Sequence, residues 1–274
     1  MVEIFSLQVQ ANESVIRLSA FLGIFAVMAL WELAAPRRRL SMGRGVRWGS
    51  NLGIVAINTV LVRLLFPVAA AGFAMVVSDE GWGLMNQVDL GVVTKIVMAL
   101  LVLDFAIYLQ HRLFHAVPLL WRLHRMHHAD LDYDVTTGAR FHPIEIILSM
   151  VIKFGVILLI GAPVVAVILF EVLLNATAMF NHGNVRLPLS IDSWLRWIVV
   201  TPDMHRVHHS VIRRETDSNF GFNLPWWDRL LGTYIAQPEE GHQGMEIGLP
   251  QFRHFGDNRL DRMLVQPFYE SLKK

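Results

Sequence analysis

Cysteine is absent from this chain of 274 residues, and charged residues make up only 17% of it. The absence of cysteine excludes disulfide bonds, thiolate metal ligands, cysteine-bound iron–sulfur clusters and a cysteine nucleophile. A soluble domain usually carries about 25% charged residues, so the scarcity of charge argues against an ordinary soluble protein. The formal net charge is +1, which gives no electrostatic basis for binding nucleic acid.

Apolar residues are abundant instead, at 54% of the chain, and the mean hydropathy is +0.43. Several apolar stretches reach the length of about 20 residues that a helix needs to cross a bilayer. These stretches cover residues 16–35, 51–77, 91–110 and 144–180. The last is too long for one span and contains Gly-Ala-Pro at 161–163, which predicts a helical hairpin. Arg63 and Pro67 interrupt the second stretch and predict a kink there.

The charges between these stretches predict the orientation of the chain. The first stretch is followed by a basic segment, which should stay in the cytoplasm. Its basic residues are Arg37, Arg38, Arg39, Arg44 and Arg47. The loop after the second stretch carries Asp79, Glu80 and Asp89 without a basic residue, which suits the far side. The sequence therefore predicts an all-α integral membrane protein of about four to five transmembrane helices or hairpin halves, with a cytoplasmic, histidine-rich helical cap.

Histidines are concentrated in three groups along the chain. The groups are His111 with His115, then His124 with His127 and His128, and finally His205 with His208 and His209. Residues three and four apart project from one face of a helix, and this spacing is typical of metal ligands. One metal takes four to six ligands, so eight to ten histidines imply two metals. Imidazole binds iron, copper and zinc, so the spacing alone leaves dizinc and dicopper open.

The chain resembles the fatty acid hydroxylase superfamily, also called the sterol desaturase family. The resemblance rests on HRLFH, HRMHH and MHRVHH, on FHPIE and FNHGN between the last two, and on the closing run ETDSNFGFNLPWWDRLLGTY. It covers about residues 100–235. We accordingly expect N-terminal transmembrane helices at 1–98, a catalytic domain at 99–237 and a C-terminal tail at 238–274.

The resemblance implies an integral membrane oxygenase that hydroxylates, desaturates or demethylates a lipid. It implies two Fe ions as cofactor, O2 as co-substrate and an external electron donor such as a reductase with a ferredoxin or cytochrome. The eight box histidines would bind the metals, joined by His142 and His182. The substrate would be sterol-like, ether-lipid or fatty-acyl, and the H-x3-H spacing of the first box favours the first two.

Several polar residues are candidates for orienting the histidines. Asp104, Tyr108, His111 and His115 form one stripe of a helix, and a carboxylate behind a ligating imidazole fixes its tautomer. An acid inside an apolar span is usually functional, although Asp104 pairing with Arg112 or Arg140 is the alternative. Glu145 and Asn219 complete the set of catalytic candidates. Further candidates for orienting imidazoles are Asp130, Asp134 and Asp217.

Other residues receive simpler interpretations. Trp226 and Trp227 are expected to mark the membrane interface. His242 and His254 stand outside every box and are expected at the surface. Glu171, on the returning half of the hairpin, is a hypothetical partner for a substrate hydroxyl, with a helix–helix contact as the alternative.

Two other functions compete with the oxygenase. A dinuclear zinc hydrolase would use metal-bound hydroxide at the same histidines. A metal-handling or transport protein would place ionisable groups near the middle of the bilayer, whereas these histidines are predicted at one membrane end. The chain contains no G-x-G-x-x-G after a strand, so an oxygenase of this sequence needs electrons from a partner.

Overall fold

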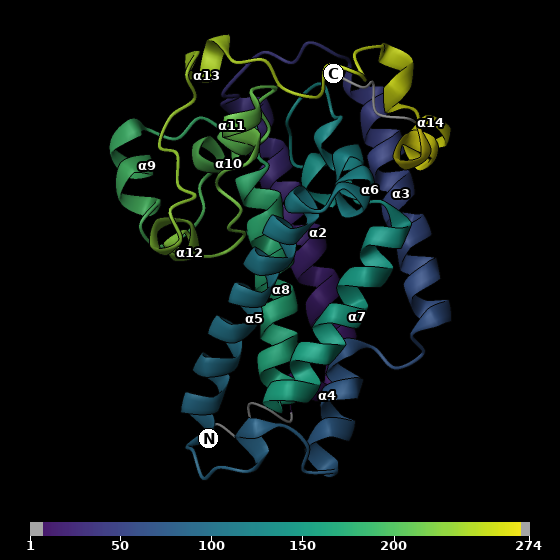
Figure 1. Ribbon diagram of the computed structural model, residues 1–274, viewed down its shortest axis with the longest axis vertical. Coiled ribbons are helices and arrows are strands. Elements are labelled where there is room, and N and C mark those ends of the chain that lie inside the picture. The colour runs from purple at the N-terminus through teal and green to yellow at the C-terminus, as the bar shows by residue number, and fades with distance from the viewer. Residues whose placement is uncertain (1–7, 270–274) are drawn as a thin grey trace.

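A computed structural model describes residues 8–269, which form helices joined by loops. Five helical segments are long and apolar enough to cross a membrane, and they run along the long axis of the molecule (Figure 1). They are α2 (Glu13–Ala34), α3 with α4 (Arg44–Leu65 and Ala70–Asp79), α5 (Val92–Ala116), α7 (Pro143–Ile160) and α8 (Val164–Asn181). Between residues 8 and 269 the only β-type pairings are two isolated bridges. The predicted all-α class and the number of spans are confirmed.

The breaks between spans occur at the residues that the sequence predicts. Helix α3 ends at Leu65, two residues before Pro67, so the kink of the second span is confirmed. The hairpin turns at Gly161, which ends α7 with a φ of 67°. Side chains larger than hydrogen are strained in this left-handed conformation, so glycine suits the turn.

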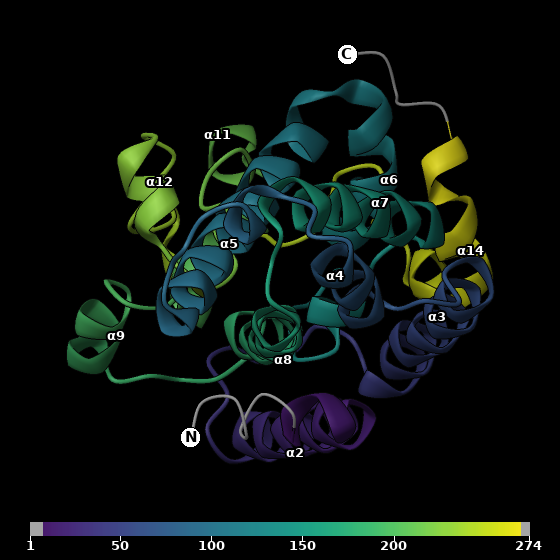
Figure 2. The same ribbon diagram turned by 90° about the horizontal axis from the view of Figure 1, so that it is seen from below.

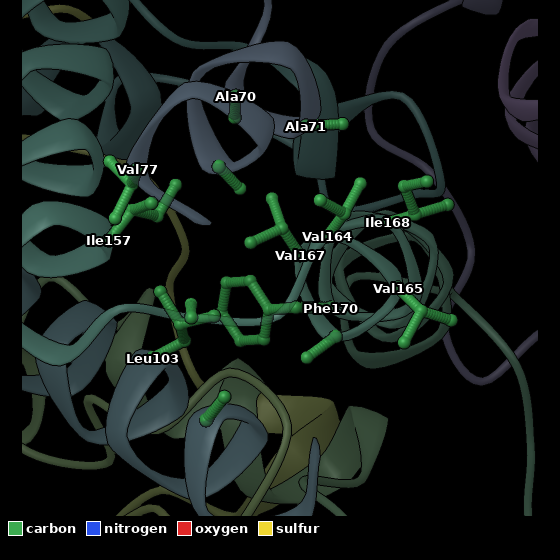
Figure 3. Packing of buried hydrophobic residues seen from close by; sticks show 14 of the residues in the cluster. Ala70, Ala71, Val77, Leu103, Ile157, Val164, Val165, Val167, Ile168 and Phe170 are labelled. Carbon is green, nitrogen blue, oxygen red and sulfur yellow. The ribbon is translucent and has the colours of Figure 1, made fainter. Parts of the chain in front are cut away.

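Helix α8 lies at the centre of the bundle, as Figure 2 shows from below. In the most apolar 18-residue stretch of α8, 56% of the residues are buried, compared with at most 22% in the corresponding stretch of any other span. Figure 3 shows Phe170 and Val167 of α8 packed among residues of three other helices, including Leu103 and Ile157. Alanines on α4, such as Ala70, allow its backbone to approach closely.

The remaining helices form a cap at one end of the bundle (Figure 1). They are α6 (Pro118–His128), α9 (Leu189–Leu195), α10 (Pro202–His208), α11 (Arg213–Thr216), α12 (Trp226–Leu230), α13 (Gly241–Gly244) and α14 (Leu260–Val265). Short 3-10 turns cover Leu84–Asn86, Thr137–Ala139, Phe255–Asn258 and Gln266–Phe268. All three histidine groups lie at this end, as the alternation of spans predicts.

Arg47 fastens the cap to the bundle, which corrects its assignment to a basic loop. It lies in the first turns of α3, is fully buried, and its Nε and Nη1 donate to Asp130 (2.6 Å) and Asp134 (2.7 Å). These two aspartates therefore bind Arg47 rather than imidazoles, contrary to the sequence-based expectation. Burial alone would raise the pKa of Asp130, but Arg47 and Arg140 lower it to about 2, so its charge persists.

Burial corrects the expectation for His242, and the ion pairs of Glu171 support one of its two interpretations. His242, expected at the surface, is 5% exposed and lies 3.5 Å from Asp203. Glu171 is held by Lys153 Nζ at 2.7 Å and by Arg17 Nη1 at 3.0 Å. This carboxylate links α8 to α7 and α2, so it has the helix–helix role that we set against substrate binding.

Candidate metal centre

Four elements deliver the clustered histidines. His111 and His115 lie one turn apart at the end of α5. Pro118 begins α6, because its ring fits the first position of a helix, and α6 then packs back on α5 with the second group of histidines. His182 follows the last residue of α8, and α10 supplies the third group.

The structure sorts nine histidines into two groups. The five-histidine group contains His111, His115, His124, His128 and His208. The four-histidine group contains His127, His182, His205 and His209. Within each group one ring nitrogen per residue lies within 4.8 Å of all the others, and none of the nine residues is more than 4% exposed.

Protein acceptors fix the tautomer of many of these rings. The Nδ1 atom of His111 lies 2.7 Å from the carbonyl oxygen of Phe220, and that of His124 lies 2.6 Å from Glu145 Oε1. Carbonyl and carboxylate oxygens only accept, so Nδ1 donates and Nε2 keeps its lone pair. Three further Nδ1 atoms have such partners: His115 with Asp217, His182 with the Ala178 carbonyl, and His208 with the Ser218 carbonyl.

This arrangement leaves lone pairs facing one another. The Nε2 atoms of His111 and His124 are 3.1 Å apart, although neither carries a proton to share. The buried Nε2 atoms of four more histidines have no hydrogen-bond partner within the described part of the chain. They belong to His115, His128, His208 and His209. A cation among these nitrogens makes the contacts favourable, so the residues fit bound metal.

The dimensions fit two ions. Imidazole nitrogens bind a metal such as zinc at about 2.0–2.1 Å, so ligands on one ion are at most about 4.2 Å apart, close to the spread seen in each group. The two groups are also in direct contact. The ring centroids of His128 and His209 lie 4.6 Å apart, and those of His124 and His127 lie 5.2 Å apart. The site therefore suits a dinuclear centre with nitrogen ligands.

Burial keeps these imidazoles in the form that binds metal. It lowers the pKa of His127, His128 and His205 well below the ordinary value, with neighbouring histidines adding to the effect. Burial likewise lowers the pKa of His182, to about 3. Only the neutral ring has a lone pair to donate, so the cluster is ready to ligate at neutral pH.

One short segment, residues 217–220, supplies three of the five tautomer-fixing acceptors. Asp217 Oδ1 accepts from His115 at 3.2 Å, and the Ser218 carbonyl accepts from His208 at 2.6 Å. The Phe220 carbonyl accepts from His111. Between them, Asn219 has a φ of 48°, a left-handed conformation that asparagine tolerates. Its side chain does not bond an imidazole but donates to the carbonyls of Met204 and Ile235.

Asp228 holds this segment in place, a role that we did not predict from the sequence. It is fully buried and accepts from the backbone N–H groups of Phe220 and Gly221, both at 2.8 Å, and from the hydroxyl of Thr233 at 2.7 Å. Tyr108, a predicted catalytic residue, joins this network, since its hydroxyl lies 2.9 Å from that of Thr233. Backbone acceptors leave no residue signature, which is why the sequence did not reveal the segment's function.

Two predicted site residues lie elsewhere. His142 belongs to neither group. Its Nδ1 accepts from the backbone N–H of Ile144 as the N-cap of α7, and its Nε2 lies 3.2 Å from the Leu264 carbonyl. Asp104, expected to hold an imidazole, accepts instead from Asn223 Nδ2 and Trp227 Nε1, both at 2.8 Å. Asp104 lies seven residues before His111 in the chain. Its carboxylate binds residues in and just before α12 and does not contact an imidazole of either group.

Helices long and apolar enough to cross a membrane bring nine buried imidazoles together at one end, in two groups that could each hold a metal ion. The family model described as "Fatty acid hydroxylase" matches residues 96–233, half of the chain. The protein therefore belongs to the fatty acid hydroxylase family, as the histidine boxes indicated.

Its relatives include lipid hydroxylases. It is 33% identical over 238 residues to ornithine lipid hydroxylase OlsE of Rhizobium tropici, a match covering 80% of this chain and 66% of that protein. It is 31% identical to the alkylglycerol monooxygenases of Xenopus tropicalis (56% of this chain, 33% of that protein) and Homo sapiens (54% and 32%). The chain thus spans about a third of the latter two. No solved structure matches it.

Proposed function

We propose that this protein is a membrane-bound di-iron oxidoreductase that uses O2 and external electrons to hydroxylate a lipid, with its histidine site facing the cytoplasm. One observation carries the proposal: two adjacent, buried groups of histidines gather ring nitrogens around common centres, and five of the nine rings have their Nδ1 proton held by a protein acceptor. Nitrogen ligands suit iron, and membership of the family favours iron over zinc or copper. The division of the chain at residues 98 and 237 is part of the proposal.

The residues around the ions have separable tasks. When bound, a pair of iron ions supplies the O2-dependent oxidation of a C–H bond, with electrons from a donor. The nine histidines would hold the ions through their ring nitrogens. Glu145 and the segment 217–220 hold the imidazoles in the ligating tautomer, and the negative charges of Glu145 and Asp217 offset part of the ions' positive charge.

Two phenylalanines close the site against water. Phe141 stacks on His127 with a centroid distance of 4.6 Å and also contacts His124, so it spans both groups. Phe222 also contacts both groups, with ring-centroid distances of 5.1 Å to His111 and 5.8 Å to His205. Apolar walls with few polar groups suit the hydrocarbon part of a lipid.

The names of the relatives guide the proposal for the substrate. We propose a membrane lipid with a polar head, such as an amino-acid lipid or an alkyl ether lipid, because the relatives are named as hydroxylases of ornithine lipids and monooxygenases of alkylglycerols. Hydroxylation is favoured over desaturation for the same reason. The cytoplasmic orientation is supported by Arg37, Arg38 and Arg39, which lie at the cap end.

The electron donor is proposed to bind the cap beside Trp121, which lies against two rings of the five-histidine group. Trp121 is half-buried, and its ring lies 4.8 Å from that of His115 and 5.3 Å from that of His128. The guanidinium of Arg213 lies over the Trp121 ring, 5.5 Å from its centroid, and the Arg213 side chain is 61% exposed. The Trp121 ring thus lies between the exposed Arg213 side chain and the histidines.

The test uses purified protein in lipid vesicles. We expect two irons per chain, and O2 consumption with a reductase and ferredoxin that yields a lipid carrying one added oxygen atom. A His124→Ala variant should lose both iron and turnover. Two zinc ions per chain, with lipid hydrolysis and no O2 consumption, would instead establish the dinuclear hydrolase.

A further inference from the structure

Two short helices of the cap, α9 and α12, have apolar side chains outside and charged ones inside. The exposed apolar residues, which we name the α9–α12 face, are Leu189, Ile191, Trp194, Trp197, Ile198, Trp226, Leu230 and Leu231, each 42–73% exposed. The charged residues of these helices turn inward. Asp192 and Arg196 pair with each other and are at most 6% exposed, and Asp228 is fully buried. A surface in water shows the opposite arrangement.

The two helices form one layer. Trp226 Nε1 donates to the carbonyl of Trp197 at 2.8 Å, and Arg229 Nη2 donates to the carbonyl of Arg196 at 3.2 Å. The guanidinium of Arg229 also lies 3.7 Å from the centre of the Trp197 ring. The charge of Arg229 is therefore satisfied within the protein, and the exposed residues of the two helices are apolar apart from Ser190 and Ser193.

The depth of this layer follows from its contact with α5. Asp104 accepts from Trp227 Nε1, Asn223 Nδ2 and, at 3.3 Å, the backbone N–H of Leu224. Asp104 lies twelve residues before the end of α5 at Ala116, which is about 18 Å along the helix axis. The hydrocarbon core of a bilayer is about 30 Å thick, and α5 is about 37 Å long, so Asp104 lies below the membrane boundary.

The layer also continues the lipid-facing surface of the bundle. On α5, Val97, Val102 and Leu109 are 37–50% exposed, as expected of side chains that face lipid. Figure 1 shows α12 at the height of the upper part of α5, and Figure 2 shows α9 and α12 outside the long helices. The α9–α12 face thus lies beside a helix whose own exposed side chains are apolar.

We propose that the α9–α12 face is embedded in the bilayer leaflet next to the cap, with the leaflet's acyl chains as its occupant. Tryptophans are enriched at the membrane–water boundary, and in-plane helices bury an apolar face about 5–10 Å below it. The segment that enters α12 contains Phe222, which contacts both histidine groups, so the leaflet reaches to within one segment of the site. This inference does not depend on which metal is bound.

The absence of cysteine makes the test direct, since single cysteines can be introduced and spin-labelled. Labels at Trp194 and Leu230 test the face. Labels at Arg214 and Glu246, whose side chains are 70% and 56% exposed elsewhere on the cap, are the controls. In phosphatidylcholine vesicles, collisions with O2, which partitions into lipid, are compared with collisions with water-soluble chromium oxalate.

We expect O2 collisions to dominate at Trp194 and Leu230, and chromium oxalate collisions to dominate at the controls, with a several-fold difference in the ratio. Ratios at Trp194 and Leu230 equal to those of the controls would overturn the proposal. Protection from both reagents at the two positions would also overturn it, because a protein partner or a second copy would then cover the face. The collision ratios depend on neither metal content nor turnover. The test of the α9–α12 face is therefore independent of the proposed function.

Discussion

At the residue scale, the clustered histidines differ from His142 in the surroundings of their ring nitrogens. In the clusters an acceptor typically takes the Nδ1 proton and leaves Nε2 free, as at His111 and His208. In His142, Nδ1 accepts a backbone N–H and Nε2 lies near a carbonyl. A histidine with both nitrogens used by the protein has no lone pair left for a metal.

Replacing His142 is therefore expected to spare the metals. Asparagine also serves as an N-cap, so His142→Asn should retain the full metal content and lose at most about 1 kcal/mol of stability. The matched His128→Asn variant removes a ligand and should lose metal. Metal analysis of both purified proteins makes the comparison, and loss of metal from His142→Asn alone would restore His142 as a ligand.

Glu145 is expected to control His124 through one hydrogen bond of 2.6 Å. Glu145→Ala removes the acceptor, and outer partners of this kind contribute about 10–100-fold to metal affinity. Glu145→Gln keeps an acceptor oxygen and should lose less. Competition with a chelator measures the affinities, and equal affinity in the parent and both variants would contradict the role of Glu145.

At the scale of elements, one loop organises histidines from two helices. Residues 217–220 bond His111 and His115 of α5 and His208 of α10, and Asp228 of α12 fixes that loop through two backbone N–H groups. The α12 region therefore connects the α9–α12 face to the clustered histidines.

Asp228→Asn is expected to weaken metal binding without removing a ligand. An amide can accept from one N–H group but cannot match a carboxylate that accepts three hydrogen bonds. We expect a loss of metal affinity within the roughly 10–100-fold range of outer partners. Asp261→Asn is the control, because Asp261 is an exposed partner of Arg259. Equal chelator resistance in the two variants would argue against a positioning role.

At the scale of the whole molecule, the metal site joins parts that are far apart in the chain. The histidines of the two groups lie on or directly after α5, α6, α8 and α10, at positions 111 to 209. The unfolded chain does not hold these nitrogens together, so the proposed metals would bind the folded state preferentially.

Removing the metals should therefore lower thermal stability. A ligand at 100 times its Kd stabilises by about 2.7 kcal/mol, which corresponds to a fall in Tm of about 5–10 °C on chelation. Restoring iron should restore the Tm. Thermal unfolding in detergent, with and without chelator, measures the change in Tm. An equal Tm in both conditions would count against a structural role for the ions.

Much of this protein could be predicted from local pattern. The length of the apolar runs predicted the spans, and Gly161 and Pro67 predicted the breaks. Helical spacing predicted eight of the nine histidines in the two groups, and the family resemblance supplied His182. Glu145 and Asp217 were also expected beside imidazoles, and they are. The spans, breaks and histidine spacing depend on composition or on residues within a few turns of one another, whereas the contacts of Glu145 and Asp217 join residues 21 and 102 positions apart.

The sequence by itself determined that helices cross a membrane and carry histidines with ligand spacing, because hydrophobicity and helical periodicity are local properties. Only the tertiary structure decided which histidines gather in each group, that His142 caps a helix, and that Asp104 binds a loop 119 residues further along the chain. It also decided that α9 and α12 turn their charges inward. Each of these depends on which distant surfaces pack together, and packing is a property of the whole chain.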